Sequence, residues 1–300
     1  MHVVVSGSRG LVGSALVPFL AAGGHRVTRL VRGTPANSDE TAWNPARGLA
    51  EPSCLGGVDA VVHLAGENIA AGRWTPARKA EIRQSRVEGT RSLCESLARL
   101  ANPPKLLVSA SAIGFYGDRG SQTLTEESGP GSGFLPDVCR EWEAAVEPAS
   151  QAGIRVVNLR FGMVLSPAGG ALQKMLLPFK LGLGGRIGSG DQFMSWIAID
   201  DAVGAIRHAL SAESLRGPVN AVAPTPVTNA EFTRLLARAL RRPAFMPVPP
   251  FAARLAFGEM ADALLLASAR VMPVRLQESG YHFRFPALED ALRYLLRRVE

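Results

Sequence analysis

The sequence predicts an α/β fold in which a doubly wound parallel sheet is followed by a small, mostly helical C-terminal lobe. Over the first two thirds of the chain, short β-branched runs alternate with longer segments of helical periodicity, which is typical of parallel strands joined by crossover helices. A glycine-rich turn separates the first strand from the first helix. A cluster of prolines, Pro243 to Pro250, then sets off the final, mostly helical segment.

The expected elements follow from these periodicities. Strands of the sheet are predicted at His2–Ser6, Arg26–Val31, Ala60–Leu64, Leu106–Ser109 and Arg155–Leu159, with later strands at Ser195–Ile199 and Val219–Val222. Helices are predicted at Leu11–Ala22, Pro76–Leu100, Pro136–Gln151 and Asn229–Leu240, the last with Thr228 as its N-cap. Pro18 removes one backbone hydrogen bond from the first helix and is expected to kink it.

The domain boundaries are expected near the change from alternating to mostly helical pattern. Residues 1–225 form the nucleotide-binding domain, with parts of 165–195 contributing to the substrate lobe, and residues 226–300 form the small C-terminal domain. A chain of 300 residues can bury one large core or two modest ones.

Composition excludes several classes of protein. With 47% hydrophobic and 20% charged residues, the chain is globular rather than disordered. No apolar run approaches the roughly 20 residues of a membrane span, and the chain opens directly on a strand-like run. We therefore expect a cytoplasmic protein that binds no membrane. Cys54, Cys94 and Cys139 are widely spaced and form no metal-binding pattern, so no metal site is expected.

The net charge of +7 raises the question of nucleic-acid binding. The arginines are scattered, and their densest cluster, Arg238 to Arg242, lies at the end of a predicted helix, where basic residues complement the helix dipole. We therefore expect no nucleic-acid partner. A positive field that attracts small phosphorylated ligands is the better use of this charge. We expect the protein to be a monomer or a homodimer.

The turn Gly7-Ser8-Arg9-Gly10-Leu11-Val12-Gly13 follows the first strand and opens the first helix. Glycines at this spacing permit a tight turn, a close approach of backbone to pyrophosphate, and close packing of helix on strand. The N-terminus of the helix offers free N–H groups to the phosphates. In this context the turn predicts a Rossmann-type dinucleotide site rather than a merely structural turn.

The form of the cofactor is predicted by the second strand. Sites for NAD(H) usually carry an acidic residue about 20 positions after the glycines, but no acidic residue occurs from Gly7 to Ser38. The strand ends instead on Arg32, whose guanidinium can grip a 2′-phosphate. We therefore predict NADP(H), with Arg9 and Arg29 as helpers. The alternative is that Arg32 is a solvated charge at the end of a strand.

Further motifs resemble a known family. The runs Asp59–Gly66, Ser109–Gly117 and Gly188–Asp201 are similar to signatures of extended short-chain dehydrogenases/reductases, in which the Leu-Ala-Gly backbone passes under the cofactor. More narrowly, Ala65–Ile69, Leu177–Gly185 and Gly280–Pro286 resemble an atypical, epimerase-like subfamily with a small C-terminal domain of unassigned function. The resemblance implies a cofactor site that, besides the glycine turn and Arg32, uses Leu64, Ala65, Gly66, Glu81, Arg86 and Val164. For Glu81 and Arg86 the alternative is an ordinary solvated pair on a helix face.

The chain departs from that family at its catalytic pair. Short-chain dehydrogenases use a tyrosine acid/base whose pKa is lowered by a lysine four residues later. None of the three tyrosines, Tyr116, Tyr281 and Tyr294, is followed by a lysine at that spacing. Where the pair is expected, the chain has Leu135 and Cys139. Neither can transfer a proton in the usual way.

Three residues near the expected nicotinamide end are candidates for the missing chemistry: Ser109, Ser111 and Tyr116. Their alternative roles are small residues that allow close cofactor approach, and an aromatic pocket wall. The leading function is an NADP(H)-dependent oxidoreductase or epimerase-like enzyme acting on a hydroxyl- or carbonyl-bearing small molecule, and the resemblance suggests a nucleotide sugar. The alternative is a non-catalytic NADP(H)-binding sensor or scaffold.

Overall fold

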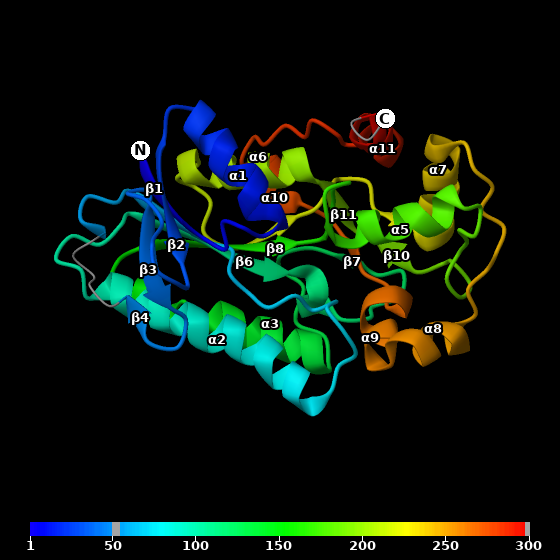
Figure 1. The fold of residues 1–300 in the computed structure, drawn as a ribbon, viewed down its shortest axis with the longest axis horizontal. Helices are drawn as coiled ribbons and strands as arrows, with labels where there is room; N and C mark the ends of the chain where they lie inside the picture. Colours follow the sequence, from blue (N-terminus) through cyan, green and yellow to red (C-terminus); the bar gives the residue numbers. More distant parts are fainter. Residues whose placement is uncertain (50–54, 298–300) are drawn as a thin grey trace.

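The computed structural model describes residues 1–49 and 55–297, and in them an eight-stranded sheet lies between two layers of helices (Figure 1). The strand order is β12-β8-β6-β5-β1-β2-β3-β4. All neighbouring strands run parallel except β3 and β4. The bounds are β1 (His2–Ser6), β2 (Arg26–Val31), β3 (Glu40–Asn44), β4 (Gly48–Leu49), β5 (Ala60–His63), β6 (Leu106–Ala112), β8 (Arg155–Phe161) and β12 (Gly217–Ala221).

Helices cover both faces of this sheet. Helices α1 (Leu11–Ala22) and α6 (Ile199–Ser211) pack on one face, and α2 (Pro76–Ala98), α3 (Phe134–Ala144) and α4 (Glu147–Gln151) cover the other (Figure 1). Successive side chains of a strand point to opposite faces, so Val3 and Val5 join the core beneath α1 and α6 while Val4 joins the core beneath α2. Because both faces are buried, the strands are nearly continuous apolar runs.

The remaining elements form the smaller lobe and its connections, on the right of Figure 1. Its short strands pair as β7 with β14, β9 with β11, and β10 with β13. The bounds are η2 (Ile113–Tyr116), β7 (Thr123–Leu124), β9 (Met163–Leu165), α5 (Gly170–Lys180), β10 (Phe193–Met194), β11 (Trp196–Ala198), β13 (Val227–Thr228), α7 (Asn229–Leu240), α8 (Pro250–Phe257), α9 (Glu259–Ala261), η3 (Asp262–Leu266), β14 (Arg270–Val271), α10 (Val274–Glu278) and α11 (Leu288–Arg297).

A buried carboxylate ties the segment before α11 to helix α6. Asp201, in the first turn of α6, is 1% exposed. It accepts hydrogen bonds from the Tyr281 hydroxyl at 3.0 Å and from the backbone N–H groups of Arg284 at 2.7 Å and Phe285 at 2.9 Å. A buried charge is tolerated only with such partners, so this carboxylate fixes the path of the segment that leads to α11.

The predicted fold class is confirmed, and most predicted strands and helices are present. Thr228 caps α7 by accepting from the N–H of Glu231, and α1 continues through Pro18. The later strand predicted at 195–199 is present as β11, which lies outside the main sheet. Two expectations differ. The helix expected over 136–151 is the two helices α3 and α4. Strand β3 was not expected, because its residues Glu40 to Asn44 are largely polar.

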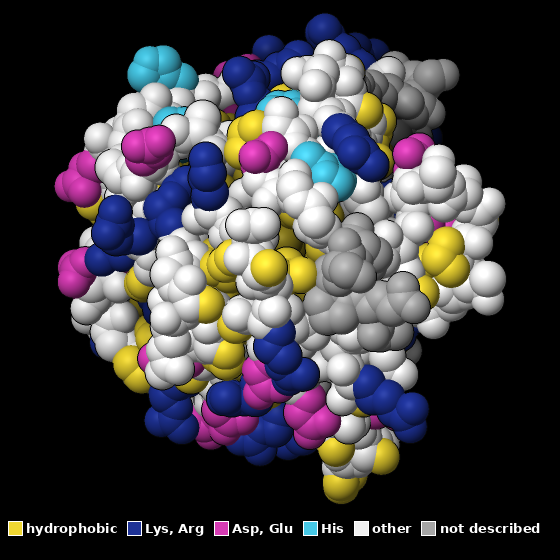
Figure 2. All heavy atoms as spheres, turned by 90° about the vertical axis from the view of Figure 1, so that its left-hand side faces the viewer, with side chains coloured by type: hydrophobic (Ala, Val, Ile, Leu, Met, Phe, Trp, Pro, Cys, Tyr) yellow, Lys and Arg dark blue, Asp and Glu magenta, His cyan; other side chains and the backbone are white. Residues whose placement is uncertain are grey.

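The surface shows how the excess positive charge is distributed. On the face shown in Figure 2, Lys and Arg side chains are interspersed with Asp and Glu rather than gathered into one stripe. Among the residues that the structure describes, no helix has both the length and the apolar character needed to cross a membrane. Of the cysteines, Cys94 and Cys139 are buried free thiols, and Cys54 lies outside the described residues.

Candidate functional site

The glycine-rich turn and the carboxyl ends of β1, β2 and β5 enclose a pocket of about 430 Å³, called here the glycine-turn pocket. It lies where ligands bind in open α/β sheets, beyond the carboxyl ends of the strands. Its volume is in the range of small-molecule sites. Its lining consists of Gly7, Ser8, Arg9, Gly10, Leu30, Val31, Arg32, Gly33, Thr34, Trp43, Pro45, Leu64, Ala65, Gly66, Glu67 and Ser85.

The turn itself requires glycine. Gly7 has φ +67°, and a Cβ there would lie 2.6 Å from the carbonyl carbon of Leu64. A Cβ on Gly13 would lie 2.2 Å from the carbonyl oxygen of Gly7. The N-cap of α1 is Gly10, which makes no side-chain capping bond, and the first turn carries no acidic residue. The N–H groups at this end are therefore available to an anion, and the turn fits the pyrophosphate of a dinucleotide.

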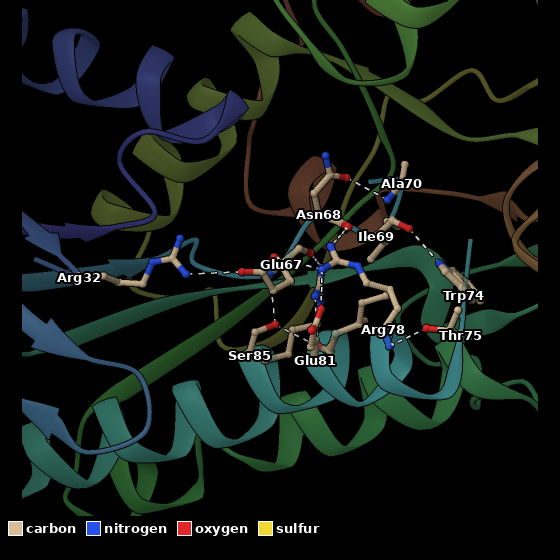
Figure 3. A network of polar contacts seen from close by, with 12 residues as sticks. Arg32, Glu67, Asn68, Ile69, Ala70, Trp74, Thr75, Arg78, Glu81 and Ser85 are labelled. Atoms are coloured by element: carbon tan, nitrogen blue, oxygen red, sulfur yellow. Dashed lines mark hydrogen bonds and ion pairs between the residues drawn. The ribbon is translucent and has the colours of Figure 1, made fainter. Parts of the chain in front are cut away.

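An ion pair crosses the mouth of the pocket (Figure 3). Arg32 Nη1 lies 3.5 Å from Glu67 Oε1, and the Arg32 side chain is 74% exposed. Glu67 also faces Arg78, at 3.5 Å, and its backbone N–H donates to the Ser85 hydroxyl. Arg78 in turn pairs with Glu81 at 2.8 Å. The Arg32 side chain is thus free to turn toward a phosphate, but it already has a carboxylate partner.

A second carboxylate lies outside the lining of the pocket but contacts Arg9, which belongs to that lining. Glu40, the first residue of β3, accepts from the Ala36 N–H at 2.9 Å. Its other oxygen lies 3.5 Å from Arg9 Nη2 and 3.7 Å from Arg29 Nη2. This carboxylate joins the glycine turn, strand β2 and the segment that follows Arg32.

The pocket brings together most of the predicted cofactor residues. Those in its lining are Gly7, Ser8, Arg9, Gly10, Arg32, Leu64, Ala65 and Gly66. Gly13 supports the turn from α1. The remaining predictions, Leu11, Val12, Glu81, Arg86 and Val164, lie outside the lining.

Arg86, Val12 and Val164 contact parts of the structure outside the lining of the pocket. The Arg86 guanidinium donates to the carbonyls of Glu67 at 3.0 Å and Ile82 at 3.2 Å, beneath the backbone that lines the pocket. Its burial lowers the pKa of this side chain. Val12 and Val164 pack against the core beneath α1 and α6. The structure therefore gives Arg86 a supporting position, and it places Glu81 on the exposed face of α2, paired with Arg78.

Near the predicted catalytic end, a buried chain of charged groups begins at Ser111. The Ser111 hydroxyl donates to Glu143 Oε1 at 2.6 Å, and Arg160 binds both oxygens of Glu143, at 2.8 and 2.7 Å. Burial acts to lower the pKa of Arg160, but the hydrogen bond and charge of Glu143 outweigh it and raise that pKa. Ser111 and Arg160 are partners in the register of β6 and β8, which places both on the face covered by α3.

Tyr116 lies on the far side of Arg160. Its hydroxyl accepts from Arg160 Nη1 at 2.9 Å and donates to Asn220 Oδ1 at 2.8 Å, and its side chain has no exposed surface. Burial raises the pKa of the phenol. This environment disfavours Tyr116 as a proton donor to a substrate. Ser109 is also buried, 1% exposed, with one long bond to the Ala110 carbonyl.

The position of the usual tyrosine–lysine pair is apolar. Leu135 and Cys139 lie on the face of α3 that contacts Gly114. Leu135 packs against a cluster of Trp74, Ile82 and Met260, and burial raises the pKa of the Cys139 thiol to about 12. The C-terminal segment thus covers this position, and neither side chain can exchange a proton near neutral pH.

Sequence reasoning missed four charged residues of the site: Glu40, Glu67, Glu143 and Arg160. One of them carried a usable signal, because Glu143 follows Leu135 and Cys139 at intervals of four on one helix face. Glu40 and Arg160 could be found only from the pairing of strands that bring them to their partners. The described residues hold no cluster of His, Cys, Asp or Glu able to bind a metal ion.

Known proteins with similar sequences and folds were compared with this chain. The model of the NAD dependent epimerase/dehydratase family matches residues 3–221, and a domain of unknown function, DUF1731, matches residues 248–295. An epimerase family protein of Mycobacterium tuberculosis is 46% identical, over 99% of this chain and 98% of its own length.

Two solved structures extend the comparison. The human epimerase family protein SDR39U1, crystallised with NADPH, has a TM-score of 0.91 and 38% identity, over 99% of both chains. A nucleoside-diphosphate sugar epimerase from Corynebacterium glutamicum has a TM-score of 0.82 and 39% identity, over 99% of this chain and 58% of its own. With a family model over most of its length and full-length relatives well above 30% identity, the chain belongs to the NAD dependent epimerase/dehydratase family.

Proposed function

We propose that the protein is an NADP(H)-dependent oxidoreductase or epimerase-like enzyme that acts on a small molecule bearing a hydroxyl or carbonyl group, with a nucleotide sugar as one candidate. This function rests on the glycine-turn pocket, which combines a pyrophosphate-binding turn with two arginines, Arg9 and Arg32, and no acid at the end of β2. The NADPH in the crystal structure of human SDR39U1 supports the same cofactor. In this proposal the protein works in the cytoplasm, as a monomer or a homodimer, without a nucleic-acid partner.

The chain's own residues divide the work of binding. Backbone N–H groups from Leu11 onward take the pyrophosphate, because that of Gly10 already donates to the Gly7 carbonyl, and Leu64 to Gly66 form the floor beneath the adjoining ribose. Arg32 leaves Glu67 to bind a 2′-phosphate. A dianionic phosphate offers a guanidinium more charge than one carboxylate does, so the exchange favours the phosphorylated cofactor.

The bound nicotinamide supplies hydride exchange with a carbon of the substrate. We assign proton transfer to Ser111, because its hydroxyl donates to a carboxylate, Glu143, whereas that of Ser109 contacts only a backbone carbonyl. With its proton directed at Glu143, the Ser111 oxygen keeps lone pairs that can accept from a substrate hydroxyl. Arg160 holds Glu143 in place. A proton leaving the substrate then moves to the Ser111 oxygen as the proton of Ser111 moves to Glu143.

A second candidate function, a non-catalytic NADP(H)-binding sensor or scaffold, is favoured by one observation. The place of the usual acid/base pair is filled by apolar packing that involves Leu135 and the C-terminal Met260. In a sensor, the same packing would make the C-terminal domain respond to the cofactor rather than enclose a substrate.

Isotope exchange distinguishes the two functions. Protein loaded with NADPH that carries deuterium at the transferable position is incubated with a panel of ketones, aldehydes and keto forms of nucleotide sugars, whose carbonyl carbon can accept the deuteride. An enzyme transfers deuterium to a substrate carbon, and Ser111→Ala lowers the transfer rate about 100-fold or more without changing NADPH affinity. If the wild type transfers no deuterium to any member of the panel but binds NADPH tightly, the sensor becomes the better description.

A further inference from the structure

We propose that Glu40 is a positioning residue that sets the preference for NADP(H) over NAD(H), by holding Arg9 and Arg29 for the 2′-phosphate. This inference rests on the proposed binding of NADP(H) in the glycine-turn pocket. It assigns a role to a carboxylate that does not itself contact the cofactor.

Glu40 is unusually buried for an acidic residue that begins a strand. Its side chain is 3% exposed, and carboxylates are seldom buried without partners. Register places it opposite Arg29 in the pairing of β2 with β3. The N–H of Ala36, followed by the charges of Arg29 and Arg9, keeps the pKa of the Glu40 carboxyl below its ordinary value. Glu40 is therefore a fixed negative charge between two cations.

Both oxygens of Glu40 are occupied. Oε2 accepts from Ala36, and Oε1 faces Arg9 and Arg29. An acid that selects NAD(H) instead directs a free oxygen at the ribose 2′-hydroxyl. Glu40 has no free oxygen and almost no exposed surface, so it cannot act as such an acid. Its effect on the cofactor must pass through the groups that it holds.

Those groups belong to three separate parts of the chain. Arg9 comes from the glycine turn and its side chain is 78% exposed, while Arg29 comes from β2. Ala36 belongs to the segment after Arg32, of which Gly33 and Thr34 line the pocket. Without Glu40, Arg9 would keep no ion-pair partner among those found in the described residues. Glu40 thus holds an otherwise mobile guanidinium at the edge of the pocket, which reduces the entropy lost when a phosphate binds.

Glu67 differs in exposure and in effect. Its side chain is 35% exposed at the mouth of the pocket, and it forms an ion pair with Arg32, the arginine that we expect to bind the phosphate. Removal of the Glu67 charge frees Arg32 to bind the phosphate. Removal of the Glu40 charge instead leaves Arg9 and Arg29 without the carboxylate that positions them. The two substitutions are therefore expected to change NADPH affinity in opposite directions.

The test measures dissociation constants for NADPH and NADH by calorimetry, with adenosine 2′,5′-bisphosphate and 5′-AMP as probes of the adenosine half alone. Glu40→Gln keeps an oxygen for Ala36 but removes the charge. We expect it to weaken NADPH and the bisphosphate about tenfold and to change NADH and AMP less than twofold. Glu127→Gln, which removes an exposed carboxylate paired with Arg275, is the matched control and should change neither.

A second variant protects the test against misfolding of Glu40→Gln. Arg9→Ala leaves Glu40 bonded to Ala36 and should lower the preference for NADPH, and the double variant should lose less than the sum of the two single losses. Unchanged or improved preference in Glu40→Gln, or full additivity with Arg9→Ala, overturns the role of Glu40 while the proposed function stands. A wild type that binds NADH as tightly as NADPH overturns both.

Discussion

Arg32 and Glu67 form an ion pair of 3.5 Å across the mouth of the glycine-turn pocket, one from the end of β2 and the other from the segment after β5. A 2′-phosphate must displace this carboxylate. We therefore expect Glu67→Gln to bind NADPH about two- to fivefold more tightly, because exposed ion pairs contribute up to about 1 kcal/mol. Titration of cofactor fluorescence measures the change, and weaker binding by the variant would show that Glu67 contributes to cofactor binding.

Arg32→Ala tests the phosphate contact itself. The substitution removes a charge-assisted bond that only the phosphorylated cofactor can form. NADPH affinity should fall at least tenfold while NADH affinity changes little, and the dependence of NADPH affinity on salt should become weaker. Calorimetry at two salt concentrations gives both quantities. Equal weakening of the two cofactors would instead make Arg32 a residue of the fold.

Gly13→Ala tests the glycine turn. The added methyl group would lie 2.2 Å from the Gly7 carbonyl oxygen, so α1 must shift away from the turn. We expect cofactor binding to be lost and the free energy of unfolding to fall by about 1–3 kcal/mol. Gly72→Ala is the control, since a Cβ at that glycine meets no atom within 4 Å. Urea unfolding and cofactor titration of both variants give the comparison, and a Gly13 variant that still binds NADPH would contradict the close packing of turn and helix.

Tyr116→Phe separates a structural role from a catalytic one. The variant removes one hydrogen bond from Arg160, which keeps Glu143, and leaves Asn220 Oδ1 without a buried partner, which should cost about 1–3 kcal/mol of stability. The rate of deuterium transfer per folded molecule should stay within about twofold of the wild type. A selective loss of transfer on the order of 100-fold, with stability intact, would restore Tyr116 as the acid.

The stability of the fold should depend on the ionisation of His63. This side chain is fully buried between Ser6 and Thr90, and burial lowers its pKa from 6.5 to about 4. Between these values the unfolded chain binds a proton that the folded chain does not, so stability falls as pH falls. The expected loss from pH 6.5 to pH 5 is about 1.5 kcal/mol. Urea unfolding of wild type and His63→Gln measures the two slopes, and equal slopes would contradict the assignment.

The sequence predicted the parts of the site that local rules determine. Gly7 and Gly13 have one local explanation each, a positive φ and a close backbone approach. The absence of an acidic residue from Gly7 to Ser38 can be read directly from the sequence. The partners of these groups are not local. Glu40 reaches Arg29 through the pairing of β2 with β3, and a sequence contains no rule for that register when the strand is short and polar.

The catalytic end was harder to predict for a related reason. Tyr116 was a natural candidate because it ends a motif near the nicotinamide, but whether a hydroxyl faces a ligand or the core depends on packing from distant segments. Arg160 and Asn220, which lies 104 residues away, both hydrogen-bond to the Tyr116 hydroxyl. Glu143 had the helical spacing of the missing pair, yet only the structure shows that Arg160 and Ser111 occupy its carboxylate.

The packing of Leu135 against Trp74 and Met260 has a consequence for the chemistry of this position. A tyrosine at position 135 would place a phenol and its hydrogen-bonding needs inside the contact with the C-terminal segment. A tyrosine–lysine pair and this contact therefore compete for the same space. Introducing the pair would require Met260 to move away from position 135 first.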